Sequence, residues 1–342
     1  MTREYIIADD SMEGRDTGRR GRVKGTNYIA AELSRFGLKP AGDNGTFFQT
    51  VPFVVRSPDS ASVLTTGGRS FTIFTDFLVV PRIGIQVFLG GLPYGGSFDG
   101  TNVPTVWGGT IGGTLLDPAQ AKGKVVVFRV AAGGSEQFWS KDDLTEYADA
   151  RAVIVDIGTD RLPPAVPMRR TAVLYNDTTL HSIPVIVATS GIVSQLFGAT
   201  TTPATGATGQ PLSGHFGYVD RPTEAPTRNV VAILPGSDPA LRGQYVAIGA
   251  HSDHVGFFPG GPVDHDSIRA FNAVARPRGA DDRPPGSVSE AQWSHIRALI
   301  DTLHRAHGGP RLDSIMNGAD DDGSGTVLAL EIAEAFARAG VK

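Results

Sequence analysis

The chain has no cysteine, and this absence narrows its possible chemistry. Disulfide bonds and thiolate metal sites are excluded, so any metal ion must be bound by His, Asp and Glu side chains. The cellular compartment stays open, because a protein without cysteine suits either side of a membrane.

Long apolar runs and an excess of positive charge are also lacking. No run approaches the roughly 20 apolar residues that span a bilayer, and residues 1–7 lack the apolar core of a signal peptide. A formal net charge of −4 gives no electrostatic reason to expect nucleic acid as a partner. The one basic cluster, Arg15 to Lys24, is short and interrupted. From the charge we therefore expect no nucleic-acid partner, and from the lack of a long apolar run we expect no membrane span.

What the chain does have is length and many turn residues. Its 342 residues suffice for two domains, and its 43 glycines and 23 prolines indicate many turns and a strand-rich region. Residues 1–56 begin with a predicted helix from Gly25 to Phe36, which carries apolar residues at helical spacing and ends before Gly37. A turn at 38–45 leads to an extended segment at 47–53.

Residues 57–222 differ in composition, with short runs of strand-forming residues separated by Gly, Pro, Asp and Thr. The clearest are Lys124–Phe128, Ala152–Asp156 and Ile183–Val187, and a short helix is predicted over Lys141–Ala150. Continuous runs of β-branched residues are typical of strands buried on both faces. We therefore predict an inserted β-rich domain with a few helices.

Residues 223–342 change character again. Asn229–Leu234 and Gln244–Gly249 are apolar runs joined by a short loop, which predicts a hairpin with His251 just past its second strand. Ligand-binding side chains commonly lie at such strand ends in open sheets. An amphipathic helix is predicted over Ser289–His307, and another from Ser324 to Arg338.

His251 and Asp253 form the first candidate site. Alternation along an extended chain points both side chains to the same side, so the Asp253 carboxylate can accept the second N–H of the imidazole. That hydrogen bond would fix the tautomer and raise the basicity of a metal-binding histidine. On its own the His-x-Asp pattern is weak evidence, and a polar turn after a strand is the simpler interpretation of it.

The second candidate is the run Asp320-Asp321-Asp322, followed by Gly-Ser-Gly and a helix. Three successive acids repel one another unless a cation or a helix N-terminus compensates. Helix capping by Asp322 or Ser324 is the alternative, and it is compatible with metal binding. Together with His251, the pattern favours Asp320 as a metal ligand in one side of a two-metal hydrolytic centre.

Other patterns are set aside. Gly279-Ala-Asp281-Asp282 repeats the acidic string but lacks the Gly-Ser-Gly turn. Asp264-His265-Asp266 could bind a cation but is interpreted as a solvated loop, and favourable placement near a helix C-terminus accounts for His304 and His307. No nucleophile elbow, P-loop or dinucleotide fingerprint is present.

These residues resemble a known family. Ala250-His251-Ser-Asp253-His254 followed by Asn317-Gly-Ala-Asp320-Asp321 is similar to the co-catalytic di-zinc aminopeptidases, which include bacterial leucyl aminopeptidases and glutamate carboxypeptidase II. Gly14-Arg15-Asp16 is similar to the entry segment of larger bacterial members. The region 57–222 resembles the protease-associated (PA) domain that many members carry as an insertion, and 257–316 is a long insertion between the ligand motifs.

The resemblance implies an α/β fold: the mixed sheet of a zinc exopeptidase, flanked by helices, in residues 1–56 and 223–342. By resemblance His251 would bind one of two zinc ions, Asp320 would bridge both, and Asp253 would orient His251. A cis peptide would join Asp320 to Asp321. The resemblance also implies peptide substrates and export from the cell.

The family pattern then requires a Glu-Glu pair, an Asp and a His that cannot be assigned here. Glu331 and Glu334 come too early and are interpreted as the solvated face of a helix. The chain is therefore expected to be an inactive N-terminal portion of a zinc exopeptidase, most simply an aminopeptidase. The alternative is a non-catalytic, receptor-like binding protein of the same architecture; aminoacyl cyclisation, as in glutaminyl cyclases, is less favoured because of the PA-like insertion.

Overall fold

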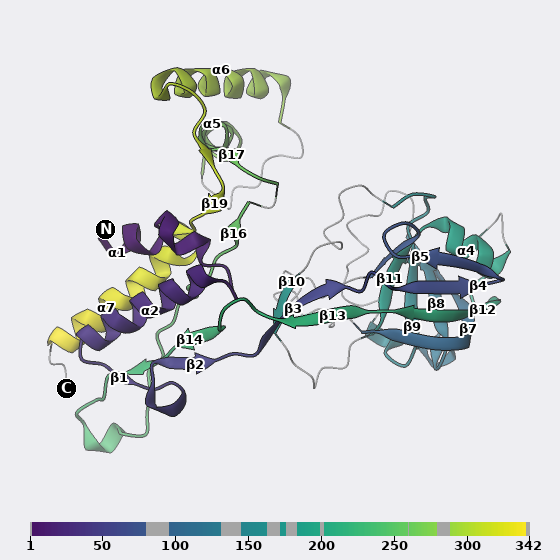
Figure 1. The fold of residues 1–342 in the computed structure, drawn as a ribbon, viewed down its shortest axis with the longest axis horizontal. Coiled ribbons are helices and arrows are strands. Elements are labelled where there is room, and N and C mark those ends of the chain that lie inside the picture. The colour runs from purple at the N-terminus through teal and green to yellow at the C-terminus, as the bar shows by residue number, and fades with distance from the viewer. Residues whose placement is uncertain are drawn as a thin grey trace. The chain divides into compact units, whose positions relative to one another are not determined.

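The computed structural model describes residues 2–79, 96–130, 145–162, 172–175, 183–198, 202–258, 260–278 and 288–339. The chain forms two compact units, which Figure 1 shows as ribbons. Unit 1 combines Met1–Val51 with Glu224–Lys342, and unit 2 is Pro52–Thr223. The sequence placed these boundaries at 57 and 222. The α/β class is confirmed, with a large mixed sheet in unit 2 and most of the helical residues in unit 1.

Unit 2 is organised around an eight-stranded mixed sheet. In spatial order its strands are β5 (Arg69–Thr72), β4 (Val63–Thr66), β12 (Thr208–Phe216), β7 (Phe98–Thr110), β8 (Val125–Arg129), β9 (Ala152–Asp156), β11 (Val185–Ala188) and β6 (Phe77–Val79). Strands β7, β8, β9 and β11 run parallel to one another, and the remaining pairings are antiparallel.

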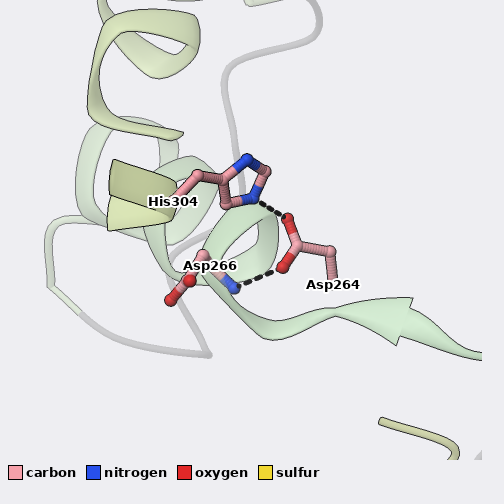
Figure 2. Close-up of side chains that lie close together, drawn as sticks. All are labelled: Asp264, Asp266 and His304. Carbon is pink, nitrogen blue, oxygen red and sulfur yellow. Dashed lines mark hydrogen bonds and ion pairs between the residues drawn. The ribbon is translucent and has the colours of Figure 1, made fainter. Parts of the chain in front are cut away.

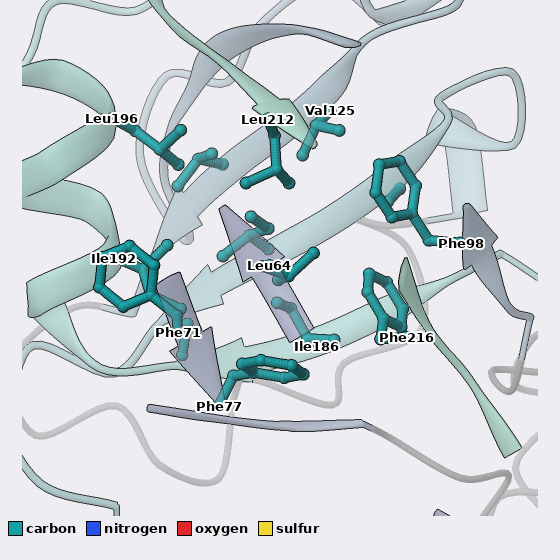
Figure 3. Packing of buried hydrophobic residues seen from close by; sticks show 14 of the residues in the cluster. Leu64, Phe71, Phe77, Phe98, Val125, Ile186, Ile192, Leu196, Leu212 and Phe216 are labelled. Atoms are coloured by element: carbon teal, nitrogen blue, oxygen red, sulfur yellow. The ribbon is translucent and has the colours of Figure 1, made fainter. Parts of the chain in front are cut away.

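The sheet of unit 2 buries both of its faces. Successive side chains of a strand point to opposite faces, and those of β8 accordingly divide between two apolar clusters. Val125 and Val127 lie in one cluster and Val126 and Phe128 in the other. Figure 3 shows the first cluster, in which Phe71, Phe77, Phe98 and Phe216 pack with aliphatic side chains. The prediction of strands buried on both faces is confirmed for β8, β9 and β11.

Smaller elements complete unit 2. They are a three-stranded antiparallel sheet of β10 (Ala172–Tyr175), β3 (Phe53–Pro58) and β13 (Tyr218–Pro222), the helix α4 (Ser190–Phe197), and the 3₁₀ turns η3 (Pro118–Ala121) and η5 (Thr145–Tyr147). Helix α4 adds Ile192, Val193 and Leu196 to the first cluster. Of the helix predicted over 141–150, residues 141–144 lie outside the described ranges and 145–147 form the turn η5.

Unit 1 is built on three helices, α1 (Thr2–Ile7), α2 (Arg20–Arg35) and α7 (Gly325–Ala339). Their shared core is small: Ile7, Ile29, Val327 and Leu330. Helix α2 begins five residues before the predicted Gly25 and ends as predicted, with Gly37 at a φ of +86°. Such left-handed backbone favours glycine after a helix.

The predicted hairpin of residues 229–249 is wrong. Short strands β14 (Arg228–Val230) and β15 (Ala232–Ile233) pair instead with β2 (Phe48–Thr50) and β1 (Lys39–Pro40). After the 3₁₀ turn η7 (Pro239–Leu241), residues 244–249 form no strand. Tyr245 and Val246 are 76% and 91% exposed. The first run takes its backbone partners from the N-terminal segment, so the second is left without one among the described residues.

The segment between the two candidate motifs has its own small architecture. Strand β16 (Gly256–Phe257) pairs with β19 (Ile315–Met316), and β17 (Val263–Asp264) pairs with β18 (Leu312–Asp313). Between them lie the helices α5 (His265–Ala275) and α6 (Glu290–His307), which pack on each other through Phe271 and Trp293. The predicted helix α6 is confirmed, with a capping box formed by Ser289 and Gln292.

Three further turns belong to unit 1: η1 (Asp10–Arg15), η2 (Asp43–Gly45) and the π-helical turn η8 (Ala319–Ser324). Turn η8 leads directly into α7 and contains the acidic run. None of the helices in the described residues is both long and apolar enough to cross a membrane.

Candidate metal centre

The acidic run and the His251 loop meet in unit 1. Nε2 of His251 lies 3.1 Å from Oδ1 of Asp321, and Nδ1 of His254 lies 3.6 Å from Oδ2 of the same carboxylate. Asp321 therefore presents each of its oxygens to a different imidazole. The side chains of His251 and Asp321 are 56% and 72% exposed, so the pair is open to solvent and to a ligand.

Asp321, and not Asp320, is the aspartate of the run that lies beside His251. Asp320 is exposed, and its carbonyl accepts a hydrogen bond from Ser324 Oγ (3.0 Å). The cis peptide expected between Asp320 and Asp321 lies one residue further along, between Asp321 and Asp322, so that expectation was wrong by one residue. In a run of three identical side chains, only the path of the backbone determines which of them faces His251.

Asp322 connects the two motifs. Its Oδ1 accepts a hydrogen bond from the N–H of Gly325 at the start of α7, and its Oδ2 accepts one from the N–H of His251, both at 3.1 Å. The capping predicted for Asp322 is thus present. It also fixes the backbone from which the His251 imidazole extends.

Asp253 lies beside His251, as the His-x-Asp spacing suggested. Its Oδ1 is 3.4 Å from Nδ1 of His251, and its Oδ2 accepts a hydrogen bond from Thr17 Oγ1 (2.9 Å). Burial on its own would raise the pKa of Asp253, but the Thr17 hydrogen bond and the charge of Arg22 hold it below its usual value. The carboxylate therefore stays ionised beside His251, whose Nδ1 lies 3.2 Å from the backbone carbonyl oxygen of Asp253, its hydrogen-bond partner.

Arg15 holds both motifs in place, a role that was missed in the sequence. Its guanidinium is fully buried and donates to the carbonyls of Ile7 (2.6 Å), Ser252 (3.0 Å), Asn317 (2.7 Å) and Gly318 (2.7 Å). Burial lowers the pKa of Arg15, and nearby acids, Glu4 first among them, oppose this effect. One side chain thus joins the loop after His251 to the segment before the acidic run.

The rest of the N-terminal segment supports the same loop. Arg22 donates a hydrogen bond to Ser252 Oγ, and the N–H of His254 donates to the carbonyl of Arg15 (3.3 Å). Gly14 has a φ of +63°, and a Cβ there would lie 2.6 Å from the carbonyl oxygens of Gly256 and Met316. The cluster Arg15 to Lys24 is therefore not a surface patch, since Arg15 and Arg22 are buried. Gly14-Arg15-Asp16 was the signal that could have revealed this.

The donor atoms suit zinc. Two donors about 2.1 Å from one tetrahedral zinc ion lie roughly 3.4 Å apart, close to the 3.1 Å between Nε2 of His251 and Oδ1 of Asp321. Imidazole and carboxylate are ligands that zinc accepts in hydrolytic sites. His251, Asp321 and the supporting Asp253 thus fit a zinc ion without a large rearrangement of their side chains.

The remaining candidates fall elsewhere. Glu334 is only 8% exposed and pairs with Arg3, so its interpretation as solvated was wrong, whereas Glu331 is exposed. Asp264 and Asp266 do not lie in a solvated loop: Asp264 caps α5 and Asp266 is fully buried. The repeated acidic string at 279–282 lies outside the described residues.

An open imidazole–carboxylate pair with a supporting acid is the kind of site found in metal-dependent hydrolases. Consistent with this class, residues 229–342 match the model of Peptidase family M28. This third of the chain therefore carries a Peptidase family M28 segment. No match was found among curated proteins.

Several solved structures are similar to the chain. Among them are an aminopeptidase from Aneurinibacillus sp. strain AM-1 (14% identity, TM-score 0.37, 98% of this chain and 59% of that one), a zinc aminopeptidase from Bacillus subtilis (15%, 0.32, 98% and 56%) and a peptidase M28 precursor from Shewanella amazonensis SB2B (14%, 0.29, 68% and 50%). The chain thus spans little more than half the length of the first two.

Proposed function

We propose that this chain contributes to a zinc-dependent exopeptidase, an aminopeptidase that removes N-terminal residues from peptides. The observation that carries the proposal is the solvent-open pair of His251 Nε2 and Asp321 Oδ1, 3.1 Å apart within the segment that matches Peptidase family M28. We propose these two residues as zinc ligands, with Asp321 in place of Asp320. The two oxygens of Asp321 face different imidazoles, which supports a carboxylate that bridges two ions.

A zinc ion bound here would lower the pKa of a water molecule and polarise a peptide carbonyl. The protein's own part is positioning. The backbone carbonyl of Asp253, 3.2 Å from Nδ1 of His251, accepts the Nδ1 proton, and the Asp253 carboxylate lies beside it, which leaves Nε2 free to bind a metal ion. Asp322 fixes the His251 backbone, and Arg15 holds the two ligand-bearing segments together. Asp253 and Arg15 are thus positioning residues.

Two finer proposals accompany this one. Unit 2, with its mixed sheet and flanking helix α4, is proposed to be a PA-like domain. A glutamate general base and further zinc ligands are not assigned to any described residue. We therefore propose that the 342 residues alone hydrolyse peptides poorly or not at all.

Zinc titration of two neighbouring variants tests the ligand assignment. In Asp321→Asn the carboxylate facing His251 loses its charge, so the zinc affinity of this centre should fall about tenfold or more. Asp320→Asn is the matched control, since it makes the same chemical change one residue away on an exposed side chain, and it should leave the affinity unchanged. The opposite ranking would restore Asp320 as the ligand and refute the geometry.

Hydrolysis of an aminoacyl anilide tests the activity. The 342-residue chain should show little turnover, and any turnover that it shows should be lost in His251→Ala. A receptor-like protein would bind no zinc at His251, so absence of zinc binding at this centre together with absence of turnover would favour that alternative. Fast turnover by the 342 residues would show that the ligand set is already complete.

A further inference from the structure

A second group of histidines and aspartates lies between α5 and α6, apart from the centre at His251. Nε2 of His304 is 2.7 Å from Oδ2 of Asp264, and Nδ1 of His307 is 2.7 Å from Oδ2 of Asp266. Figure 2 shows His304 at the end of α6 pointing at Asp264, with Asp266 beside them. Two side chains from the start of α5 thus meet two from the last turn of α6, some 40 residues later.

This group carries a buried negative charge. Asp266 is fully buried and the Asp264 side chain is only 14% exposed. The guanidinium of Arg311, 3.1 Å from Oδ1 of Asp266, is the one fixed positive charge among the described groups that contact these carboxylates. The neighbouring His265 is already paired with Asp313 (2.7 Å). Two carboxylates thus face one fixed positive charge, and a bound cation would balance the second carboxylate.

Both carboxylates are held by hydrogen bonds from surrounding groups, Asp264 through both of its oxygens and Asp266 through Oδ1. Oδ1 of Asp264 accepts from the backbone N–H groups of Asp266 (3.2 Å) and Arg311 (3.1 Å), and Oδ1 of Asp266 accepts from the Arg311 side chain. The Oδ2 atoms face the imidazoles, although Oδ2 of Asp264 also accepts from Ser267. Metal-binding carboxylates are typically anchored by such hydrogen bonds from surrounding groups.

The donor atoms are close enough for one ion. One ligand atom each from Asp264, Asp266 and His304 lies within 4.8 Å of the others. A tetrahedral zinc ion needs its donors roughly 3.4 Å apart, a change that small side-chain rotations can supply. His304 and His307 are about one-third exposed, so an ion can enter from solvent.

We propose that Asp264, Asp266 and His304 bind a zinc ion, with His307 as the fourth donor, at a structural site separate from the centre at His251. Asp264, Asp266 and His304 are the three residues whose donor atoms lie within 4.8 Å of one another, and His307 is added as the fourth through its contact with Asp266 (2.7 Å). Four protein donors are typical of a structural rather than a catalytic zinc site. The ion would fasten the end of α6 to the start of α5.

The experiment uses the full chain carrying His251→Ala and Asp321→Asn, which removes the ligands of the other candidate centre. Zinc is titrated by calorimetry, and Co²⁺ absorption reports the coordination geometry. We expect one zinc ion per chain in this background, with a tetrahedral Co²⁺ spectrum. Adding His304→Gln should weaken binding about tenfold or more. His295→Gln, at an exposed position on the same helix, is the matched control and should change nothing.

A further variant distinguishes loss of zinc binding from loss of the folded structure. Asp264→Asn keeps a residue that caps helices well but removes the ligand charge, so it should lose zinc while circular dichroism shows the helices intact. Zinc should also increase the hydrogen-exchange protection of α6 in the background chain. If the background binds no zinc, or if His304→Gln and Asp264→Asn both retain its affinity, the contacts are a hydrogen-bonded network only and the proposed site is refuted. Neither result depends on the outcome at His251.

Discussion

Two apolar runs of similar composition differ in secondary structure and in burial. Ala152–Asp156 forms β9, lies between β8 and β11, and is completely buried. Residues 244–249 are equally rich in aliphatic and aromatic side chains, yet they form no strand, and Val246 is 91% exposed. An apolar run specifies a strand only when other strands are available to pair with it, because strand preference depends on cross-strand packing.

The two units also differ in what holds them together. Unit 2 has apolar clusters on both faces of one sheet, whereas the apolar core of unit 1 is small and is supplemented by buried arginines. Unit 1 should therefore be most sensitive to the loss of polar contacts, and unit 2 to the loss of apolar volume.

The largest effect is expected from Arg15→Ala. Four carbonyls, two of them buried and two partly buried, lose their donor at once, and the change should destabilise unit 1 by about 4 kcal/mol or more. Hydrogen exchange in peptides from α2 and α7, measured against urea, reports the free energy of unfolding of this unit. The control Arg20→Ala removes an exposed arginine and should cost less than about 0.5 kcal/mol. Equal effects of the two variants would contradict the role of Arg15.

A pair of substitutions tests the comparison directly. Ile154→Ala opens a cavity in the core of unit 2 and should cost about 2–5 kcal/mol. Val246→Ala shortens a side chain that is 91% exposed and should change stability by less than about 0.5 kcal/mol. Urea denaturation of each variant measures both values. A large loss in Val246→Ala would mean that residues 244–249 are paired in solution.

A smaller effect is expected from Thr17→Val. Without the hydroxyl that donates to Asp253 Oδ2, the carboxylate is less firmly held against His251. Zinc affinity at His251 should fall roughly tenfold, as is typical when a supporting hydrogen bond to a metal site is removed. Calorimetric titration measures the affinity, and Thr17→Ser is the control, since it keeps the hydroxyl and should keep the affinity. A similar loss in both variants would point to packing instead.

The smallest effect concerns pH. The hydrogen bond from Arg3 holds the pKa of Glu334 below its ordinary value of 4.5. Because the folded pKa is the lower one, the unfolded state binds more protons between the two values, so the contribution is complete above about pH 4.5 and is lost as the pH falls through the lowered pKa. In Arg3→Gln the free energy of unfolding of unit 1 should therefore depend less on pH below about pH 4.5. Urea denaturation at several pH values measures this dependence. Arg20→Gln should leave it unchanged.

Local features were predictable from the sequence, and contacts between distant residues were not. The strands β8 and β9 follow from β-branched runs, and α6 follows from its apolar spacing and capping residues. The meeting of His251 with the acidic run was predicted, but not which of three identical aspartates faces it. The pairing of β14 with β2 depends on residues about 180 positions apart, which no local pattern encodes.

Buried polar contacts were the hardest to foresee. Asp264 and His304 are both polar, so each was interpreted on its own as a solvated or dipole-stabilised residue. Their contact depends on how α6 packs on α5. Arg15 looked like part of an interrupted basic cluster, and its burial becomes apparent only once the carbonyls it binds are in place.

The contacts of Arg15 also set an order of events during synthesis. The arginine is made early, but its acceptor at Gly318 comes 303 residues later. At about 5–20 residues per second, a ribosome needs roughly 15–60 seconds to cover that distance. During this interval unit 2 can emerge and fold between the two halves of unit 1, while the segment carrying Arg15 waits without its partners. The N-terminal segment is therefore where we expect a chaperone to be needed most.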